Sequence, residues 1–353
     1  MIVAGGGTGG HLFPGLAVAE AVAARGGTDV LFVGSAYGIE AKAIPATPFP
    51  FHALFVRGVR GRGIRGVLAF GWELPRAVRE SWRILSRFRP TLVLGLGGYG
   101  SVPVALAAWL RRVPLVLLEQ NAYPGFANRL LGRLARKICT TYAESAVFFP
   151  AGKAVHTGNP VRQLVCRQRP VPEHFTLFAF GGSQGAHSIN VAMLDAAPVL
   201  LRELPGLRIV HQTGAADAQW VRQRYDAVGV EADVREFVAD MGDAYGRADL
   251  IICRAGATTL AELTALGKPA ILIPYPFAAD DHQRRNAEIL VAQGAAEMIR
   301  NVDLNGERLA TAVVALARER ERLTTMSARA RSLAVPDATA RVVAVCCQAT
   351  GEE

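Results

Sequence analysis

Two glycine-rich segments of this chain each follow a short apolar run and precede a helical pattern. The first is GGGTGGH at 5–11 and the second is GGSQGA at 181–186. A strand that enters a helix through such a turn brings backbone amides and the helix dipole close to a phosphate. The duplication therefore predicts two α/β domains, each with an anion-binding turn, facing each other across a cleft.

Short apolar runs alternate with amphipathic stretches through both halves of the 353-residue chain. Such alternation predicts parallel sheets covered by helices on both faces. The expected strands are 2–4, 30–33, 92–96, 115–118 and 138–141 in the first half, and 176–180, 207–212, 250–253 and 270–274 in the second. The expected helices are 14–25, 73–88, 103–110, 188–202, 258–266, 282–293 and 337–349.

The two halves join near HTGNPVR at 156–162, where Gly158 and Pro160 predict a hinge. We therefore expect two Rossmann-like, doubly wound α/β domains, comprising residues 1–157 and 158–336. The last helix, within about 337–353, is expected to pack back on the first domain.

Basic residues are concentrated in the N-terminal part of the chain. Residues 1–160 carry 18 Lys and Arg against 7 Asp and Glu, whereas residues 161–353 carry 21 against 23. Nine arginines fall within 57–89, beside only two acids. A localised basic face predicts an anionic partner, either a nucleic acid or a membrane surface.

Targeting and membrane-spanning segments are not expected. The N-terminus has no basic segment before its apolar residues, unlike a signal peptide. The 21 uncharged residues of 90–110 could cross a bilayer as a helix. Four glycines and Pro103 interrupt them, so a buried strand, a glycine loop and a short helix are expected instead. The five cysteines form no CxxC pair, which predicts a reducing compartment and no zinc site.

The first glycine turn has more than one interpretation. Gly5, Gly7 and Gly10 satisfy the GxGxxG pattern of dinucleotide sites. The next expected strand ends in Gly34-Ser35, without the acid that would hold a ribose. No lysine follows the glycines as it would in a P-loop. Close packing of a strand against a helix is the remaining alternative.

Three further segments carry polar side chains suited to chemistry. In RAGATTLAE at 254–262, Glu262 lies one turn into a helix, where it could bind ribose hydroxyls or only favour its own helix dipole. His11 could accept a proton near neutral pH, although a lone histidine is more often structural. DDHQ at 280–283 looks like a metal cluster, but adjacent residues seldom converge on one ion. We therefore expect His282 and Gln283 to contact sugar hydroxyls and not to bind a metal ion.

The motifs occur in one order along nearly the whole chain. They are GGGTGGH at 5–11, GLGGYGSVP at 95–103, EQNAYPG at 119–125, TGNPVR at 157–162, GGSQGA at 181–186, EFVADM at 236–241, RAGATTLAE at 254–262 and PYPFAADDHQRRNA at 274–287. This series resembles the MurG family of bacterial glycosyltransferases, which add N-acetylglucosamine to undecaprenyl-pyrophosphoryl-muramoyl-pentapeptide in peptidoglycan synthesis. Leu118 stands where that family often has a histidine.

The resemblance implies a GT-B fold with the donor, UDP-N-acetylglucosamine, bound mainly by the C-terminal domain. It implies transfer to the muramoyl 4-hydroxyl with inversion, a β-1,4 linkage, UDP as the leaving group, and neither a cofactor nor a metal ion. It also implies contact with other cell-wall and division proteins.

The resemblance also implies roles for residues at matching positions. His11 is the candidate general base. The implied donor contacts are Thr8, Gly9, Gly10, Asn121, Arg162, Ser183, Val238, Ala257, Thr258, Thr259, Glu262, His282 and Gln283. The implied contacts to the acceptor pyrophosphate are Gly7, Gly98, Tyr99 and Gln120.

The basic stretch acquires a specific interpretation, because the implied acceptor is a lipid. Apolar and basic residues interleave as in an amphipathic surface suited to anionic lipid headgroups. The expected membrane contacts are Ile64, Arg65, Val67, Leu68, Phe70, Trp72, Arg76, Arg79, Trp82, Arg83 and Trp109. The enzyme is therefore expected at the cytoplasmic face of the cell membrane as a peripheral protein. An ordinary solvated arginine face is the alternative.

Other classes of protein agree less well with these sequence features. A UDP-N-acetylglucosamine 2-epimerase would share the donor pocket but has no use for a lipid-binding surface. A nicotinamide-dependent oxidoreductase is disfavoured by the missing ribose acid and by the duplicated glycine turns. Nucleic-acid binding is disfavoured because no recognition motif accompanies the basic surface. Diglycosyl-lipid synthases share the two-domain plan and are the alternative within the transferases.

Overall fold

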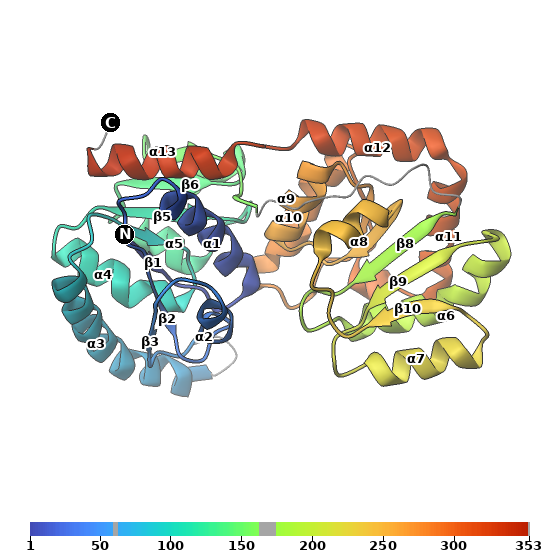
Figure 1. Ribbon diagram of the computed structural model, residues 1–353, viewed down its shortest axis with the longest axis horizontal. Helices are drawn as coiled ribbons and strands as arrows, with labels where there is room; N and C mark the ends of the chain where they lie inside the picture. The colour runs from blue at the N-terminus through green and yellow to red at the C-terminus, as the bar shows by residue number, and fades with distance from the viewer. Residues whose placement is uncertain (59–62, 162–173, 352–353) are drawn as a thin grey trace. The chain divides into compact units, whose positions relative to one another are not determined.

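The computed structural model describes residues 1–58, 63–161 and 174–351, and the side chains of 63–69 lie outside the description. The chain forms two compact units (Figure 1). Unit 1 comprises Met1–Arg162 and Val335–Glu353, and unit 2 comprises Gln163–Ala334.

Unit 1 contains a seven-stranded sheet with the order β3-β2-β1-β4-β5-β6-β7, and every neighbouring pair is parallel. Its strands are β1 Ile2–Ala4, β2 Leu31–Ser35, β3 Phe51–Leu54, β4 Val93–Gly95, β5 Leu115–Glu119, β6 Lys137–Thr140 and β7 Ala154–His156. Its α-helices are α1 Gly9–Ala24, α2 Glu40–Ala43, α3 Gly63–Phe88, α4 Val102–Leu110, α5 Phe126–Leu131 and α13 Ala338–Thr350. Short 3₁₀ turns lie at η1 Ile44–Ala46, η2 Tyr99–Ser101 and η3 Ala143–Phe148.

Both faces of this sheet are buried, which explains the nearly continuous apolar runs. Along β5, Val116 and Leu118 belong to one core cluster, and Leu115 and Leu117 belong to another. Side chains of α1 and α13 complete the first cluster, and side chains of α3 and α4 complete the second. The C-terminal helix α13 is therefore part of the unit 1 core.

Unit 2 contains a six-stranded, fully parallel sheet with the order β10-β9-β8-β11-β12-β13. Its strands are β8 Thr176–Phe180, β9 Arg208–Gln212, β10 Ala232–Arg235, β11 Leu250–Cys253, β12 Ala270–Leu272 and β13 Glu297–Met298. Its helices are α6 His187–Glu203, α7 Ala218–Ala227, α8 Met241–Arg247, α9 Ala257–Leu266, α10 His282–Ala292, α11 Gly306–Arg318 and α12 Arg320–Ser332, with 3₁₀ turns η4 Ala279–Asp281 and η5 Asn301–Asp303.

The expectation of two doubly wound parallel sheets is confirmed. The nine expected strands are present, and β3, β7, β10 and β13 were not expected. All four are the outermost strands of their sheets. An outermost strand has a neighbour on one side only, so it needs less apolar sequence than a central strand.

Two helices begin earlier than the sequence indicates. The expected start of the first helix near Pro14 is wrong, because α1 begins at Gly9 and contains Pro14. Likewise α3 begins at Gly63, ten residues before its expected start, and contains Pro75. A proline inside a helix removes one backbone hydrogen bond and crowds the preceding turn, so both prolines suggested helix starts, whereas packing of α1 and α3 on the sheet compensates for the loss. The 90–110 stretch forms β4, η2 and α4, and no described helix is both long and apolar enough to cross a membrane.

Candidate active site

Each sheet reverses its strand order at one place, between β1 and β4 in unit 1 and between β8 and β11 in unit 2. Loops that leave the carboxyl ends of such strands form the usual ligand site of an open parallel sheet. The predicted glycine turns follow β1 and β8, so both lie at these positions.

The first turn is built from glycines in conformations that other residues avoid. Gly5, Gly6 and Gly7 have φ angles of 112°, 141° and 88°. A Cβ at Gly5 would lie 2.6 Å from the carbonyl oxygen of Gly97, and one at Gly98 would lie 2.7 Å from that of Gly6. The loops after β1 and β4 therefore meet backbone to backbone, and side chains there would separate them.

His11 and Thr8 contact each other at the start of α1. Thr8 Oγ1 lies 2.8 Å from His11 Nδ1. If Nδ1–H donates to Thr8, Nε2 of the neutral ring is left as the acceptor. This tautomer is the one that a general base acting through Nε2 requires. Gly9 and Gly10, also predicted to contact substrate, form the first residues of α1.

The amide of Gly7, predicted to meet the acceptor pyrophosphate, has a partner inside the protein. It donates to Glu40 Oε2 at 2.7 Å, and the amide of Ser35 donates to Glu40 Oε1 at 2.9 Å. The aromatic ring of Tyr99 lies beside Gly7, and a Cβ built on Gly7 would lie 3.5 Å from that ring. Sequence reasoning did not single out Glu40.

A second buried acid, Glu119, organises the EQNAYPG segment at 119–125. Its carboxylate accepts from the amides of Asn121 and Gly125 and from the side chain of Asn128, at 2.9, 3.1 and 2.9 Å. Burial nevertheless raises the pKa of Glu119. Gln120 is also buried, with its Nε2 donating to the carbonyl of Leu96. The predicted contacts Gln120 and Asn121 therefore belong to a mostly internal network.

The backbone around the second glycine turn is packed as closely as the backbone around the first. A Cβ at Gly185 would collide with the carbonyl of Thr213. Gln212, at the end of β9, donates to the carbonyl of Gly182 at 2.7 Å and accepts from the amide of Val238 at 3.3 Å. Gln212 thus ties the glycine turn to the EFVADM segment. Ser183, a predicted diphosphate contact, is exposed at the turn.

Arg254 joins the loops that follow β11 and β12. Its guanidinium donates to the carbonyls of Ile273 and Pro274 at 3.1 and 3.2 Å, to Asn301 Oδ1 at 2.8 Å and to Ser188 Oγ at 2.9 Å. Burial lowers the pKa of Arg254 to about 10. These bonds hold the backbone that leads into α9, whose first residues are the predicted contacts Ala257, Thr258 and Thr259.

The remaining predicted contacts of unit 2 lie on α9 and α10. Glu262 is half-buried, and its Oε2 accepts from the hydroxyl of Tyr245 at 2.8 Å. His282 Nδ1 lies 2.7 Å from the carbonyl of Ala279, and Gln283 Oε1 accepts from the amide of Tyr275 at 2.9 Å. Since β8, β11 and β12 are neighbours in a parallel sheet, the segments after them share one edge of unit 2. Arg162 lies outside the described residues.

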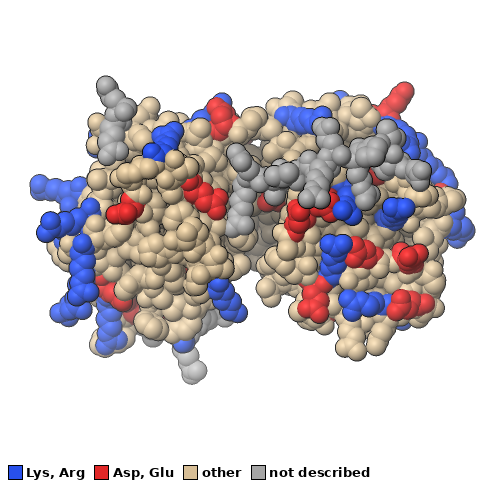
Figure 2. All heavy atoms as spheres, viewed as in Figure 1, with Lys and Arg blue, Asp and Glu red and all other residues tan. Residues whose placement is uncertain are grey.

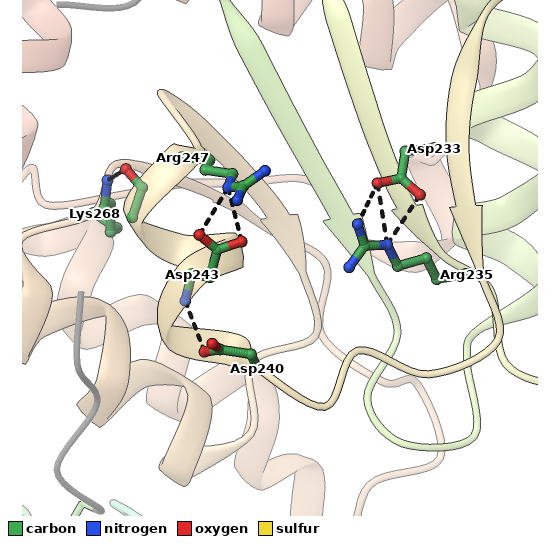
Figure 3. A network of polar contacts seen from close by, with 7 residues as sticks. Asp233, Arg235, Asp240, Asp243, Arg247 and Lys268 are labelled. Carbon is green, nitrogen blue, oxygen red and sulfur yellow. Dashed lines mark hydrogen bonds and ion pairs between the residues drawn. The ribbon is translucent and has the colours of Figure 1, made fainter. Parts of the chain in front are cut away.

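Surface ion pairs flank the segment that contains Val238 (Figure 3). On β10, Arg235 pairs with Asp233 at 2.6 Å, and on α8, Arg247 pairs with Asp243 at 2.7 Å. Asp240 caps α8 by accepting from the amide of Asp243 at 2.9 Å. Exposed pairs contribute little stability, so the cap and Gln212 are the more important anchors of this loop.

The helix α3 presents an aromatic and basic surface. Trp72 and Trp82 are exposed, as are Arg76, Arg79 and Arg83. Arg76 lies 4.6 Å from the ring centre of Trp72, and Arg111 of the segment after α4 lies 4.9 Å from that of Trp82. Figure 2 shows basic side chains gathered over α3.

The predicted membrane contacts do not all lie on that surface. Trp109 on α4 is exposed, whereas Phe70 is half-buried against the unit 1 core. Phe70 thus packs partly against the core, and its membrane contact stays a prediction. The side chains of Ile64, Arg65, Val67 and Leu68 lie outside the description.

Two family domains match this chain. The glycosyltransferase family 28 N-terminal domain matches residues 1–140, and the C-terminal domain of the same family matches residues 176–342. The chain belongs to glycosyltransferase family 28. The family 28 assignment agrees with the resemblance found in the motifs, and it makes the chain a glycosyltransferase.

Two curated relatives of this family 28 chain carry the same name. Proteins of Anaeromyxobacter sp. strain K and Myxococcus xanthus are 48% and 46% identical to it. Both alignments span 98% of this chain and 92% of the relative. Both relatives are named UDP-N-acetylglucosamine–N-acetylmuramyl-(pentapeptide) pyrophosphoryl-undecaprenol N-acetylglucosamine transferase.

Solved structures agree with the family 28 fold. The crystal structure of Acinetobacter baumannii MurG is 31% identical, with a TM-score of 0.80 and 98% of each chain covered. The Neisseria meningitidis UDP-GlcNAc 2-epimerase bound to UDP-GlcNAc has a TM-score of 0.69 at 13% identity, over 98% of this chain and 99% of its own. The second likeness shows the shared fold alone.

The described residues contain no cluster of three or more His, Cys, Asp or Glu able to hold a metal ion. Asp281 instead forms an ion pair with Arg284. Glu40, Gln212 and Arg254 are the residues of these sites that sequence reasoning missed. They act by holding loops, and no local pattern distinguishes such residues.

Proposed function

We propose that this chain transfers N-acetylglucosamine from UDP-N-acetylglucosamine to undecaprenyl-pyrophosphoryl-N-acetylmuramoyl-pentapeptide, producing the disaccharide lipid used in peptidoglycan synthesis. The observation that carries the proposal is the 48% identity, over 98% of the chain, to relatives named for this reaction. The glycine turns at both switch points support it, because the donor and the acceptor each contain a pyrophosphate.

Unit 2 holds the donor in this proposal. Amides at the start of α9 and the Ser183 turn bind the diphosphate, and Arg162, the last residue of the first segment of unit 1, is assigned to it as well. The backbone at Val238 binds the uracil, Glu262 binds the ribose hydroxyls, and His282 and Gln283 contact the sugar. The partial positive charge of the α9 N-terminus offsets the charge that develops on departing UDP.

Unit 1 holds the acceptor in this proposal. His11 Nε2 takes the proton of the muramoyl 4-hydroxyl as that oxygen attacks the anomeric carbon of N-acetylglucosamine. The bond from the anomeric carbon to the UDP oxygen breaks, and UDP carries away the electron pair. Attack opposite the leaving group inverts the configuration and forms the β-1,4 linkage.

The exposed face of α3 docks on the cytoplasmic face of the cell membrane in this proposal. Trp72, Trp82 and Trp109 insert at the headgroup level, and Arg76, Arg79 and Arg83 attract anionic lipids. The exposed side chains of α3 and the cation–π contacts of Trp72 and Trp82 support this assignment. A peripheral position would bring the enzyme to an acceptor that is itself held in the bilayer.

Transfer of labelled N-acetylglucosamine to a short-chain analogue of the monosaccharide lipid tests the proposal. We expect disaccharide-lipid formation that is unaffected by a metal chelator. UDP release or sugar isomerisation without that lipid product would overturn the acceptor assignment and favour an epimerase.

Two substitutions separate the roles of the units. His11→Ala should leave UDP-N-acetylglucosamine affinity unchanged and lower turnover by about 100-fold or more, because the attacking hydroxyl loses its base. Glu262→Ala should weaken donor affinity, measured by calorimetry. Turnover near the wild-type value in His11→Ala would contradict the base assignment, and unchanged donor affinity in Glu262→Ala would contradict the ribose assignment.

A further inference from the structure

We propose that Glu40 is a positioning residue for catalysis: its carboxylate holds the glycine turn after β1 in the conformation that places Thr8 and His11. This inference rests on the proposed function of His11. Glu40 is only 1% exposed, so it cannot touch substrate and must act through the turn.

Both carboxylate oxygens of Glu40 are engaged by backbone amides from different loops. Oε2 accepts from Gly7 at 2.7 Å and Oε1 accepts from Ser35 at 2.9 Å. Gly7 immediately precedes Thr8, and Ser35 ends β2. The carboxylate therefore fastens the catalytic turn to the neighbouring strand of the sheet.

Three glycines make room for this carboxylate. A Cβ at Gly6 would lie 2.6 Å from Glu40 Oε2, and one at Gly34 would lie 2.7 Å from Glu40 Cγ. A Cβ at Gly38 would collide with the carboxylate. The site is thus shaped around the acid by glycines from three positions in the chain.

Burying the Glu40 carboxylate costs more free energy than a purely structural contact requires. A buried carboxylate loses its hydration, and within the described part of the chain no Lys, Arg or His pairs with Glu40. An apolar side chain could fill the same space without that desolvation, but it would leave the amides of Gly7 and Ser35 without these acceptors. What the carboxylate supplies instead is two directed acceptors, which hold Gly7 at its φ of 88° and so set the direction of the chain into Thr8.

The glycine turn after β1 also orients His11, the proposed base. Thr8 follows Gly7 directly in the sequence, and the Thr8 hydroxyl oxygen lies 2.8 Å from His11 Nδ1. If the turn shifts, the contact between Thr8 Oγ1 and His11 Nδ1 shifts with it. Because proton transfer depends steeply on geometry, loss of the Glu40 anchor should appear in turnover.

Glu40→Gln is the first test, because it keeps the size of the side chain but replaces one acceptor oxygen by an NH₂ that faces a backbone N–H. We expect turnover to fall about 10- to 100-fold with donor affinity unchanged. Glu20→Gln, the same substitution on the exposed side of α1, is the matched control and should leave turnover unchanged. Wild-type turnover in Glu40→Gln would overturn the proposal.

Gly38→Ala is the second variant, and it keeps the proposal testable if Glu40→Gln fails to fold. It displaces the carboxylate without changing any charge, and Gly38 is not at a positive φ. We expect the same loss of turnover. Gly71→Ala on α3 is the control, because nothing lies within 4 Å of its Cβ position.

A double-mutant cycle distinguishes positioning from general destabilisation. If Glu40 acts through His11, Glu40→Gln should cost little further activity in the His11→Ala background. Multiplying losses would overturn the positioning role while leaving the proposed function intact. Failure of the proposed function is seen separately, as wild-type turnover in His11→Ala alone or as the absence of lipid product from the wild-type enzyme.

Discussion

At the scale of single residues, the buried side chain of His211 in unit 2 lies within hydrogen-bond distance of two other buried side chains, Tyr225 and Asn190. His211 is fully buried, with Nδ1 3.0 Å from the hydroxyl of Tyr225 and Nε2 3.0 Å from Asn190 Oδ1. Asn190 also donates to the carbonyl of Thr213, beside the second glycine turn. This network links the packing of unit 2 to the loop proposed to bind the donor.

The burial of His211 predicts a dependence of stability on pH. Desolvation lowers its pKa from 6.5 to about 4, so the folded protein holds it neutral while the unfolded chain binds a proton below pH 6.5. Stability is therefore retained above that pH and lost as the pH falls toward the folded value. The loss between pH 7 and pH 5 is about 2 kcal/mol.

Urea unfolding of wild type and His211→Gln at the two pH values checks this expectation. The variant should be less stable at neutral pH because it disturbs the network, but its stability should change less between the two conditions. Equal pH dependence in the two proteins would show that His211 does not control acid stability.

At the scale of secondary structure, α3 has two faces with different tasks. Ala77 and Leu85 are buried in the unit 1 core, whereas Trp72, Arg76 and Arg79 are exposed. The i, i+4 and i+7 spacing of the exposed three places them on one side of the helix. One element can therefore stabilise the fold and also present the surface proposed to dock on a membrane.

Replacing Arg76, Arg79 and Arg83 together by alanine should weaken binding to anionic vesicles by about 100-fold, because each cation near such a surface contributes separately. Cosedimentation with phosphatidylglycerol vesicles measures the effect, and neutral vesicles should show no difference. A triple alanine variant of the exposed Arg208, Arg224 and Arg320 of unit 2 is the charge-matched control. Equal losses in the two variants would indicate a general charge effect and not docking through α3.

At the scale of the whole molecule, the two ends of the chain share one core. Val342 and Cys346 of α13 are buried in the same cluster as Val3 and Leu16. The segment that completes unit 1 is thus synthesised after all of unit 2.

Removing residues 338–353 should therefore destabilise unit 1 and spare unit 2. Several buried apolar side chains lose their cover, which corresponds to about 5 kcal/mol or more. The truncated protein should lose transferase activity but still bind UDP, as measured by calorimetry. Unchanged thermal unfolding of the truncated protein would contradict this role for α13.

Much of this organisation was predictable from local sequence. The central strands are buried on both faces, so their apolar runs are continuous, and the glycine turns between strand and helix mark the switch points. The outermost strands were missed because partial exposure allows a mixed sequence such as ADVR in β10. Helix periodicity alone did not reveal that Phe70 packs partly against the unit 1 core, because several helix faces can cover a sheet.

Short-range pattern and backbone conformation were enough to predict the two parallel sheets, the place of the glycine turns and the family indicated by the order of motifs. Tertiary structure decided which groups hold the turns. Glu40 and Gly7 are 33 positions apart in the sequence, and Gln212 and Gly182 are 30 positions apart. Local sequence pattern cannot reveal contacts over such separations. Such hydrogen bonds form only when neighbouring strands bring distant loops to one edge of a sheet, so the partners that orient the proposed catalytic and donor-binding groups are a property of the fold.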